Sequence, residues 1–167
     1  MRATILQRGT QRVWLAVAGL ALWALLALTI EALASPPLFA LLPLVVLAAA
    51  FEAVYAVHTA VERVGRYVQV FFEEAGDGWE HTAMAYGAAF KGGGIDPLFC
   101  AYFWSATLLN LIPMLLAEPV TPEWMVLGAA HLAVMWRILV ARRTAAGQRA
   151  VDLERFRQLR DARPPRT

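Results

Sequence analysis

The chain has 167 residues, of which 59% are hydrophobic and 17% charged, with a formal net charge of +2. Its mean hydropathy of +0.52 lies well above the usual balance of soluble domains and argues against a water-soluble fold. The single cysteine, Cys100, excludes an internal disulfide and a thiolate metal cluster. The length suits one compact four-helix bundle and leaves little chain for a separate catalytic domain.

Four apolar stretches, at 13–34, 36–58, 97–117 and 122–141, each have about the length that the hydrocarbon core of a bilayer requires of a helix. Three of them begin at a capping residue followed by proline, a pattern typical of helix N-termini. Short turns join the first to the second and the third to the fourth. The sequence therefore predicts an all-α integral membrane fold, a four-transmembrane-helix bundle of two hairpins within residues 1–141. The capping pairs are Ser35-Pro36, Asp96-Pro97 and Thr121-Pro122.

The first stretch has a second interpretation, a secretory signal peptide. Residues 32–34, Ala-Leu-Ala, have the small-x-small pattern of a cleavage site and follow a basic start. Cleavage there would leave three spans. However, the apolar region is long for a signal peptide, and Glu31 and Trp23 within it favour a retained helix.

Positive charges predict the orientation, because Lys and Arg in loops are retained on the cytoplasmic side. The turns expected on the other side, at 35–36 and 118–121, contain neither residue type. We therefore expect a protein of the cell (inner) membrane with both termini in the cytoplasm. The basic residues expected at the cytoplasmic side are Arg2, Arg8, Arg12, Arg63, Arg66, Lys91, Arg142 and Arg143.

The second predicted helix continues past the membrane, because no proline interrupts residues 58–74. A helix of roughly 37 residues would be about 55 Å long, so it should project into the cytoplasm. Its polar residues gather on one side at about 100° per residue. This polar face comprises Glu52, Tyr55, His58, Thr59, Glu62, Arg63, Arg66, Gln69 and Glu73.

Ionisable groups at membrane depth are costly and normally face a bundle interior, an aqueous cavity or a partner. Glu52 and Arg137 lie at similar depths in the second and fourth stretches, so we predict an interhelical contact between them. Alternatively, Arg137 extends to the inner interface and Glu52 is protonated against a tyrosine or backbone group. The candidates for a buried polar site or a transport path are Glu52, Tyr55, Asn110, His131 and Arg137.

Histidines raise the question of a metal or haem. His58 and Glu62 are one helical turn apart, a spacing that could present both to one metal ion, and His81 could join them at the inner boundary. Alternatively, His58 and Glu62 simply belong to the polar surface of the helix. A di-iron carboxylate bundle requires Glu-x-x-His motifs, which the chain lacks. Bis-histidine haem would pair His131 with His58, but their depths differ by about 10 Å. We expect no cofactor, and a hydrogen bond between Asn110 and His131 instead.

Three further features lie outside the polar face. Pro113 should bend the outer half of the third span and free the carbonyl of Leu109. Between the hairpins, Asp77 and Glu80 have the spacing of a capping box, which predicts a short amphipathic interfacial helix through Phe90 within the loop 59–96. Residues 142–167 form a basic cytoplasmic C-terminal tail suited to anionic lipid.

No catalytic signature is recognisable, so the functional hypotheses rest on the polar residues. The first is a non-catalytic accessory or scaffold subunit of a membrane complex, which binds a protein partner or another copy of itself and no nucleic acid. The second is a small transporter or channel lined by Glu52, Arg137, His131 and Asn110. The third is a metal or haem protein using His58, Glu62 and His81. The docking candidates of the first hypothesis are His58, Glu62, Arg63, Arg66, Gln69 and Glu73.

Overall fold

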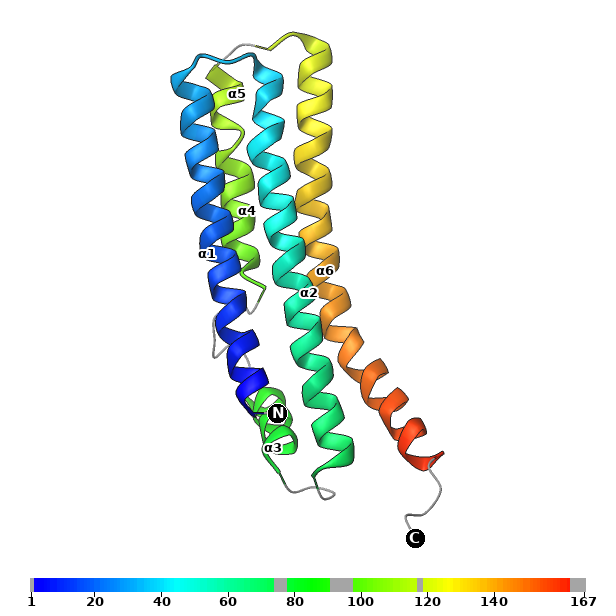
Figure 1. The fold of residues 1–167 in the computed structure, drawn as a ribbon. Helices are drawn as coiled ribbons and strands as arrows, with labels where there is room; N and C mark the ends of the chain where they lie inside the picture. The colour runs from blue at the N-terminus through cyan, green and yellow to red at the C-terminus, as the bar shows by residue number, and fades with distance from the viewer. Residues whose placement is uncertain (1, 74–77, 91–97, 117–118, 163–167) are drawn as a thin grey trace.

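The computed structural model describes residues 2–73, 78–90, 98–116 and 119–162, which form helices and no strand. Figure 1 shows α1, α2, α6 and the α4–α5 segment running side by side, with α3 at the end of the bundle where both chain termini lie. The elements are α1 (Arg2–Ala32), the 3-10 helix η1 (Pro37–Ala40), α2 (Leu41–Phe71), α3 (Trp79–Ala89), α4 (Cys100–Leu109), α5 (Ile112–Leu116) and α6 (Thr121–Asp161).

The helices are apolar enough to fit a membrane. Three segments have the length and hydropathy of a membrane span: Gly9–Ala32, Pro37–Phe71 and Thr121–Asp161. Large apolar side chains such as Leu28 and Met125 are about 71% exposed on the outer surface of the bundle, as expected of helices that face lipid. The all-helical fold is therefore confirmed, and its three long apolar helices indicate a membrane protein.

The third predicted span is interrupted. Instead of one bent helix over 97–117, the described part of this stretch forms α4 and α5, separated at Asn110 and Leu111. Pro113 lies in the first turn of α5, where a missing N–H removes no helical hydrogen bond. The proline therefore favours the start of a new helix rather than a bend within an old one.

Two helix starts differ in detail from the predicted caps. The second helix of the first predicted hairpin begins with η1. The N-cap of η1 is Pro36 rather than Ser35, and no side chain caps it. Helix α6 starts at Thr121, and its N-cap is Val120. There the Glu123 carboxylate accepts a hydrogen bond of 3.0 Å from the Val120 N–H, which is the half of a capping box that an acidic residue in the first turn provides. The pairs at Asp96 and Asp77 involve residues outside the described ones.

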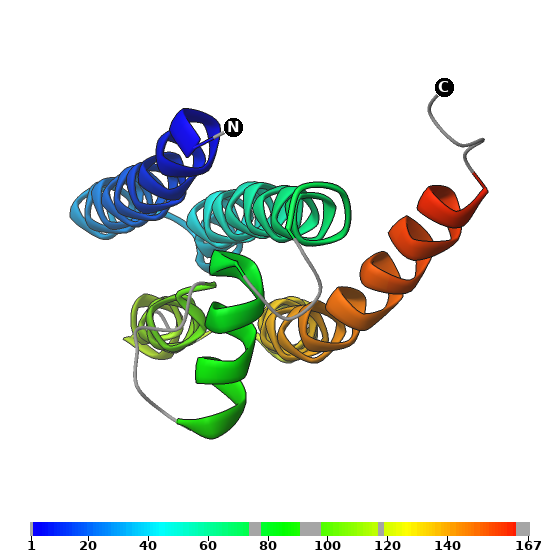
Figure 2. The same cartoon turned by 90° about the horizontal axis from the view of Figure 1, so that it is seen from below.

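The core lies between α1, α2, α4 and α6. Phe51 of α2 and Phe103 of α4 are almost fully buried, and their rings meet edge to face at 5.4 Å. Around them pack Leu47, Val54 and Ile138. Gly19 of α1 lies against Ala50 of α2 so closely that a Cβ on the glycine would overlap it. Seen along the bundle, these four helices form a square in which α2 and α6 share one side (Figure 2).

Helix α6 continues without a break through Asp161. The segment 142–167, described from the sequence as a basic tail, is therefore helical through that residue. It packs on α2, because Phe156 meets Tyr67 at 5.7 Å and Phe71 at 6.3 Å between ring centroids. We call the part of α2 from His58 to Phe71, α3, and α6 from Arg142 to Asp161 the three-helix module.

Candidate functional site

The predicted contact between Glu52 and Arg137 is present. Arg137 Nε lies 2.7 Å from one carboxylate oxygen of Glu52, and its second nitrogen donates to the other oxygen at 2.9 Å, a bidentate geometry. The guanidinium also lies 5.0 Å from the ring centroid of Tyr55. The side chains of Glu52 and Arg137 are 45% and 41% exposed. This ion pair therefore lies on the outer surface of α2 and α6 and not inside the bundle.

A second polar cluster joins four elements in the interior. Asn110, which is 1% exposed, accepts from the indole N–H of Trp23 at 3.0 Å and donates to the Ala40 carbonyl at 2.9 Å. Its amide nitrogen also lies 3.1 Å from Nε2 of His131, as the sequence predicts. His131 Nδ1 is 2.7 Å from the Leu127 carbonyl, which only an N–H can satisfy. The imidazole is thus neutral, with Nε2 accepting from Asn110.

The two polar clusters do not share a cavity. Glu52 and Arg137 border a groove of about 220 Å³ that is open to the outside. A larger cavity of about 450 Å³ lies at the other end of the bundle, between the end of α1, η1 and α5. Asn110 and His131 line neither of them. The four residues expected along one transport path are therefore divided between an outer groove and a buried hydrogen-bond network.

Within the three-helix module, the polar face of α2 pairs with α6. Arg149 lies 2.7 Å from Glu62, and Arg63 lies 3.4 Å from the buried Asp152. One turn before the α2 part of the module, the hydroxyl of Tyr55 lies 3.1 Å from the hydroxyl of Thr144 in α6. These contacts, together with the packing of Phe156, hold the second half of α6 along α2 beyond the apolar core.

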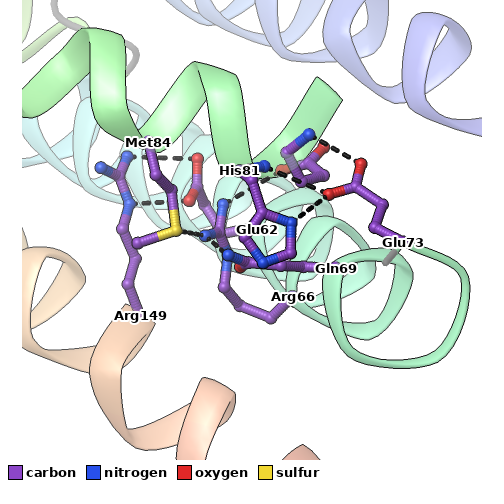
Figure 3. Close-up of polar contacts among 8 residues, drawn as sticks. Glu62, Arg66, Gln69, Glu73, His81, Met84 and Arg149 are labelled. Atoms are coloured by element: carbon purple, nitrogen blue, oxygen red, sulfur yellow. Dashed lines mark hydrogen bonds and ion pairs between the residues drawn. The ribbon is translucent and has the colours of Figure 1, made fainter. Parts of the chain in front are cut away.

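Helix α3 is bound to the end of α2 through charged groups (Figure 3). The Glu73 carboxylate accepts from the backbone N–H groups of Glu80 at 2.8 Å and His81 at 3.1 Å, so it caps α3. Its oxygen also lies 2.8 Å from Nδ1 of His81. Arg66, buried at 5% exposure, contacts Glu80 at 3.1 Å and Gln69 at 2.9 Å, and also the sulfur of Met84.

These contacts shift the titration of two carboxyl groups in opposite directions. Burial disfavours the charged form of Glu73, but hydrogen bonds from the Glu80 N–H and from His81 outweigh it and lower the pKa of Glu73. Burial is also the largest influence on Glu80, and there it prevails: it raises the pKa, aided by the charges of Glu73 and Glu62 and opposed by Arg66. Glu73 is therefore the ionised cap on which the attachment of α3 depends.

His58 and Glu62 border the same small gap between α2 and α6, but each of the three candidate metal ligands contacts a different group of the chain. His81 contacts Glu73, whereas His58 is buried and its Nδ1 lies 2.9 Å from a guanidinium nitrogen of Arg12. Glu62 is engaged by Arg149. Among the described residues, no three His, Cys, Asp or Glu side chains are grouped as they would need to be to hold a metal ion. Both ring nitrogens of His131, the remaining haem candidate, contact other groups of the chain.

Each of the six docking candidates of the polar face thus has a partner within the chain. Sequence reasoning missed the residues that provide these partners on α6. Arg149, Asp152 and Phe156 recur at the spacing of one helical face, a signal that would have shown a second polar and aromatic stripe facing α2. The other partners of the polar face that were missed are Arg12, Glu80 and Met84, and Trp23 was missed as a partner of Asn110.

Comparison of the chain with protein-family models, with curated proteins and with solved structures finds no match.

Proposed function

We propose that this chain is a non-catalytic accessory or scaffold subunit of a membrane complex, and that its three-helix module carries the docking surface for a protein partner. The observation that supports the proposal is the use made of the polar face of α2. Its charged side chains pair with groups of α6 and α3 and hold these two helices in place. Exposed arginines of α6, among them Arg155 and Arg157, favour an acidic partner surface.

The proposal includes a four-span topology in the inner membrane, with both termini in the cytoplasm. The α4–α5 segment would be the third span, broken in the middle. Broken helices are tolerated at membrane depth where protein buries the free backbone groups, and Asn110 at the break is buried and hydrogen-bonded to neighbouring elements. The placement of the arginines supports the orientation.

Cysteine accessibility in intact cells tests this topology. In a Cys100→Ala background, Ser35→Cys and Thr121→Cys should react with a membrane-impermeant maleimide, and Arg157→Cys should react only after the cells are opened. Labelling of Arg157→Cys in intact cells would contradict the orientation. Protection of Thr121→Cys while Ser35→Cys reacts would contradict the fourth span.

The docking role is tested by reversing one charge of the module. Arg149→Glu places a carboxylate against Glu62 and near Asp152, so it should loosen α6 from α2. We expect a stoichiometric partner, recovered with the tagged chain after cross-linking in the membrane, to fall several-fold. The combined variant Glu62→Arg, Arg149→Glu restores the pair in reverse and should recover the partner.

Two results would count against the docking role. One is the absence of any stoichiometric partner with the unaltered chain. The other is a partner that persists after removal of residues 142–167, because this truncation deletes the α6 part of the module while retaining the apolar helices. The charge-exchange variant serves as the matched control, since it has the same composition of charges as the unaltered protein.

A small transporter or channel is the second candidate, and the Glu52–Arg137 ion pair is the observation that favours it, because charges at membrane depth often mark transport pathways. In that case Glu52→Gln would abolish transport in vesicles while the protein remains folded. If the ion pair is only structural, Glu52→Gln lowers stability and the unaltered protein transports nothing, so the same experiment distinguishes the two.

A further inference from the structure

The position of the Glu52–Arg137 ion pair is unusual for a membrane helix pair. At 1.5 Å per residue, Glu52 lies about 22 Å along its helix from Pro37, and Arg137 about 24 Å from Thr121. Both depths fall within a hydrocarbon core of about 30 Å. Yet the two side chains are 45% and 41% exposed on the outside of the bundle. Charged groups at such a depth normally face protein or water, so this surface requires a cover other than lipid.

The surface beside the pair is shaped for a close neighbour. The groove of about 220 Å³ is lined by the charged pair, by Phe51 and Val134, and by the small side chains of Ala48 and Ala133. Small residues allow the backbones of membrane helices to approach closely. Helices α1 and α4 lie on the opposite side of the bundle (Figure 2), so neither of them covers the groove.

We propose that this groove is the contact surface of a homodimer within the membrane. A two-fold axis along the membrane normal keeps every residue at its own depth and sets α2 of one copy against α6 of the other. Glu52 of each copy then faces Arg137 of the other copy. The surface is thus complementary in charge to itself, as a two-fold symmetric interface requires.

Reciprocal pairing explains the features that the single chain leaves open. The second copy removes lipid from both ion pairs and adds an opposite charge to each of the four groups. Polar groups of this kind give membrane helices specific association, because apolar lipid offers no competing partner. The proposal goes beyond the docking role of the three-helix module, since it uses a different surface and does not depend on a partner protein.

Cross-linking in native membranes tests the geometry. Two differently tagged chains, both with Cys100→Ala, are co-expressed, one with Ala48→Cys and the other with Ala133→Cys, and treated with a short bifunctional maleimide. We expect a cross-linked product that carries both tags. In the matched control, Ala48→Cys is replaced by Leu25→Cys, which lies on the exposed surface of α1. That pair should give no such product, and equal yields from the two pairs would overturn the proposal.

A steric variant tests the same surface without cysteine chemistry. Ala133→Phe fills the groove, whereas Ala101→Phe adds the same bulk to an exposed position of α4. Energy transfer between labelled chains in vesicles should fall at least tenfold for Ala133→Phe and remain unchanged for Ala101→Phe, with unaltered helical content in both. A monomeric unaltered chain, or equal transfer in both variants, would overturn the dimer. A different membrane protein as the occupant would appear as heterologous cross-links to Ala133→Cys without the doubly tagged product.

Discussion

Replacing Asn110 by leucine should destabilise the bundle more than any other single polar change in its apolar part. Leucine has the same branched skeleton of four side-chain heavy atoms and is not smaller than asparagine, so the variant removes hydrogen bonds without opening a cavity. The side chain of Asn110 makes three such bonds, to Trp23, Ala40 and His131. Asn110 also lies at the break between α4 and α5, so these bonds tie the break to neighbouring elements.

The expected cost follows from these three bonds. A buried hydrogen bond contributes about 0.5–1.5 kcal/mol net in proteins, and side-chain bonds between membrane helices average about 0.6 kcal/mol. Three bonds therefore give a loss of about 2–4 kcal/mol in the free energy of unfolding. His131→Leu should cost less, because it removes one contact of Asn110 and the bond to Leu127. The double variant should cost less than the sum, because each single change leaves the other residue unpaired.

Titration with SDS in mixed micelles, followed by circular dichroism, measures these free energies. Ser105→Ala is the matched control, because Ser105 is an exposed polar residue of the same helix and should change stability by less than about 0.5 kcal/mol. If Asn110→Leu were no more destabilising than Ser105→Ala, the hydrogen-bond network would not be holding α4, α5 and η1 together, and the account of the broken span would be wrong.

Three more outcomes are expected. The pKa of Glu73 is lowered, so its contribution to the attachment of α3 is fully present above the ordinary carboxyl pKa and is lost as the pH falls through the lowered value. Hydrogen exchange of the Glu80 and His81 amides, corrected for intrinsic rates, should show protection at neutral pH that disappears in acid. Glu73→Ala should remove this protection at neutral pH. Protection that persists in the Glu73→Ala variant would contradict the capping role of Glu73. Glu52→Gln should lower the free energy of unfolding by about 1–2 kcal/mol, between the values for exposed and buried pairs, and Glu52→Gln with Arg137→Gln should cost less than the two separately; strict additivity would argue against the pair. The protein purified in mild detergent should show no Soret band and no stoichiometric metal by elemental analysis, and dialysis against a chelator should leave its melting temperature unchanged; a coloured protein would instead make the histidines ligands.

Patterns within single helices were predictable from the sequence. The apolar stretches at 13–34, 36–58 and 122–141 anticipate the three long apolar helices, because bilayer thickness fixes the length of a spanning helix. The continuation of α2 to Phe71 follows from the absence of proline and from the one-sided polar pattern. The contacts from Glu52 to Arg137 and from Asn110 to His131 were predictable from the expected depths of these residues alone. Polar groups at the same depth in an apolar bundle tend to pair with one another.

Other features depended on the packing of helices, which local patterns do not encode. Depth along a helix says nothing about the direction in which a side chain points. The sequence therefore predicted the Glu52–Arg137 contact but not its place on the outer surface of the bundle. In the same way, the side chain of Asn110 at the break is hydrogen-bonded to Trp23 and Ala40, and both come from distant parts of the chain.

The sequence by itself determined that the chain is helical and apolar, how long its main helices are, and where along each helix the polar residues lie, because these properties depend on neighbours within a few turns. Only the tertiary structure decided that the polar face of α2 is occupied by Arg149, Asp152 and α3. The physical reason is that a charged side chain takes whichever opposite charge the packing of helices brings within reach, and that choice depends on residues more than eighty positions away in the chain.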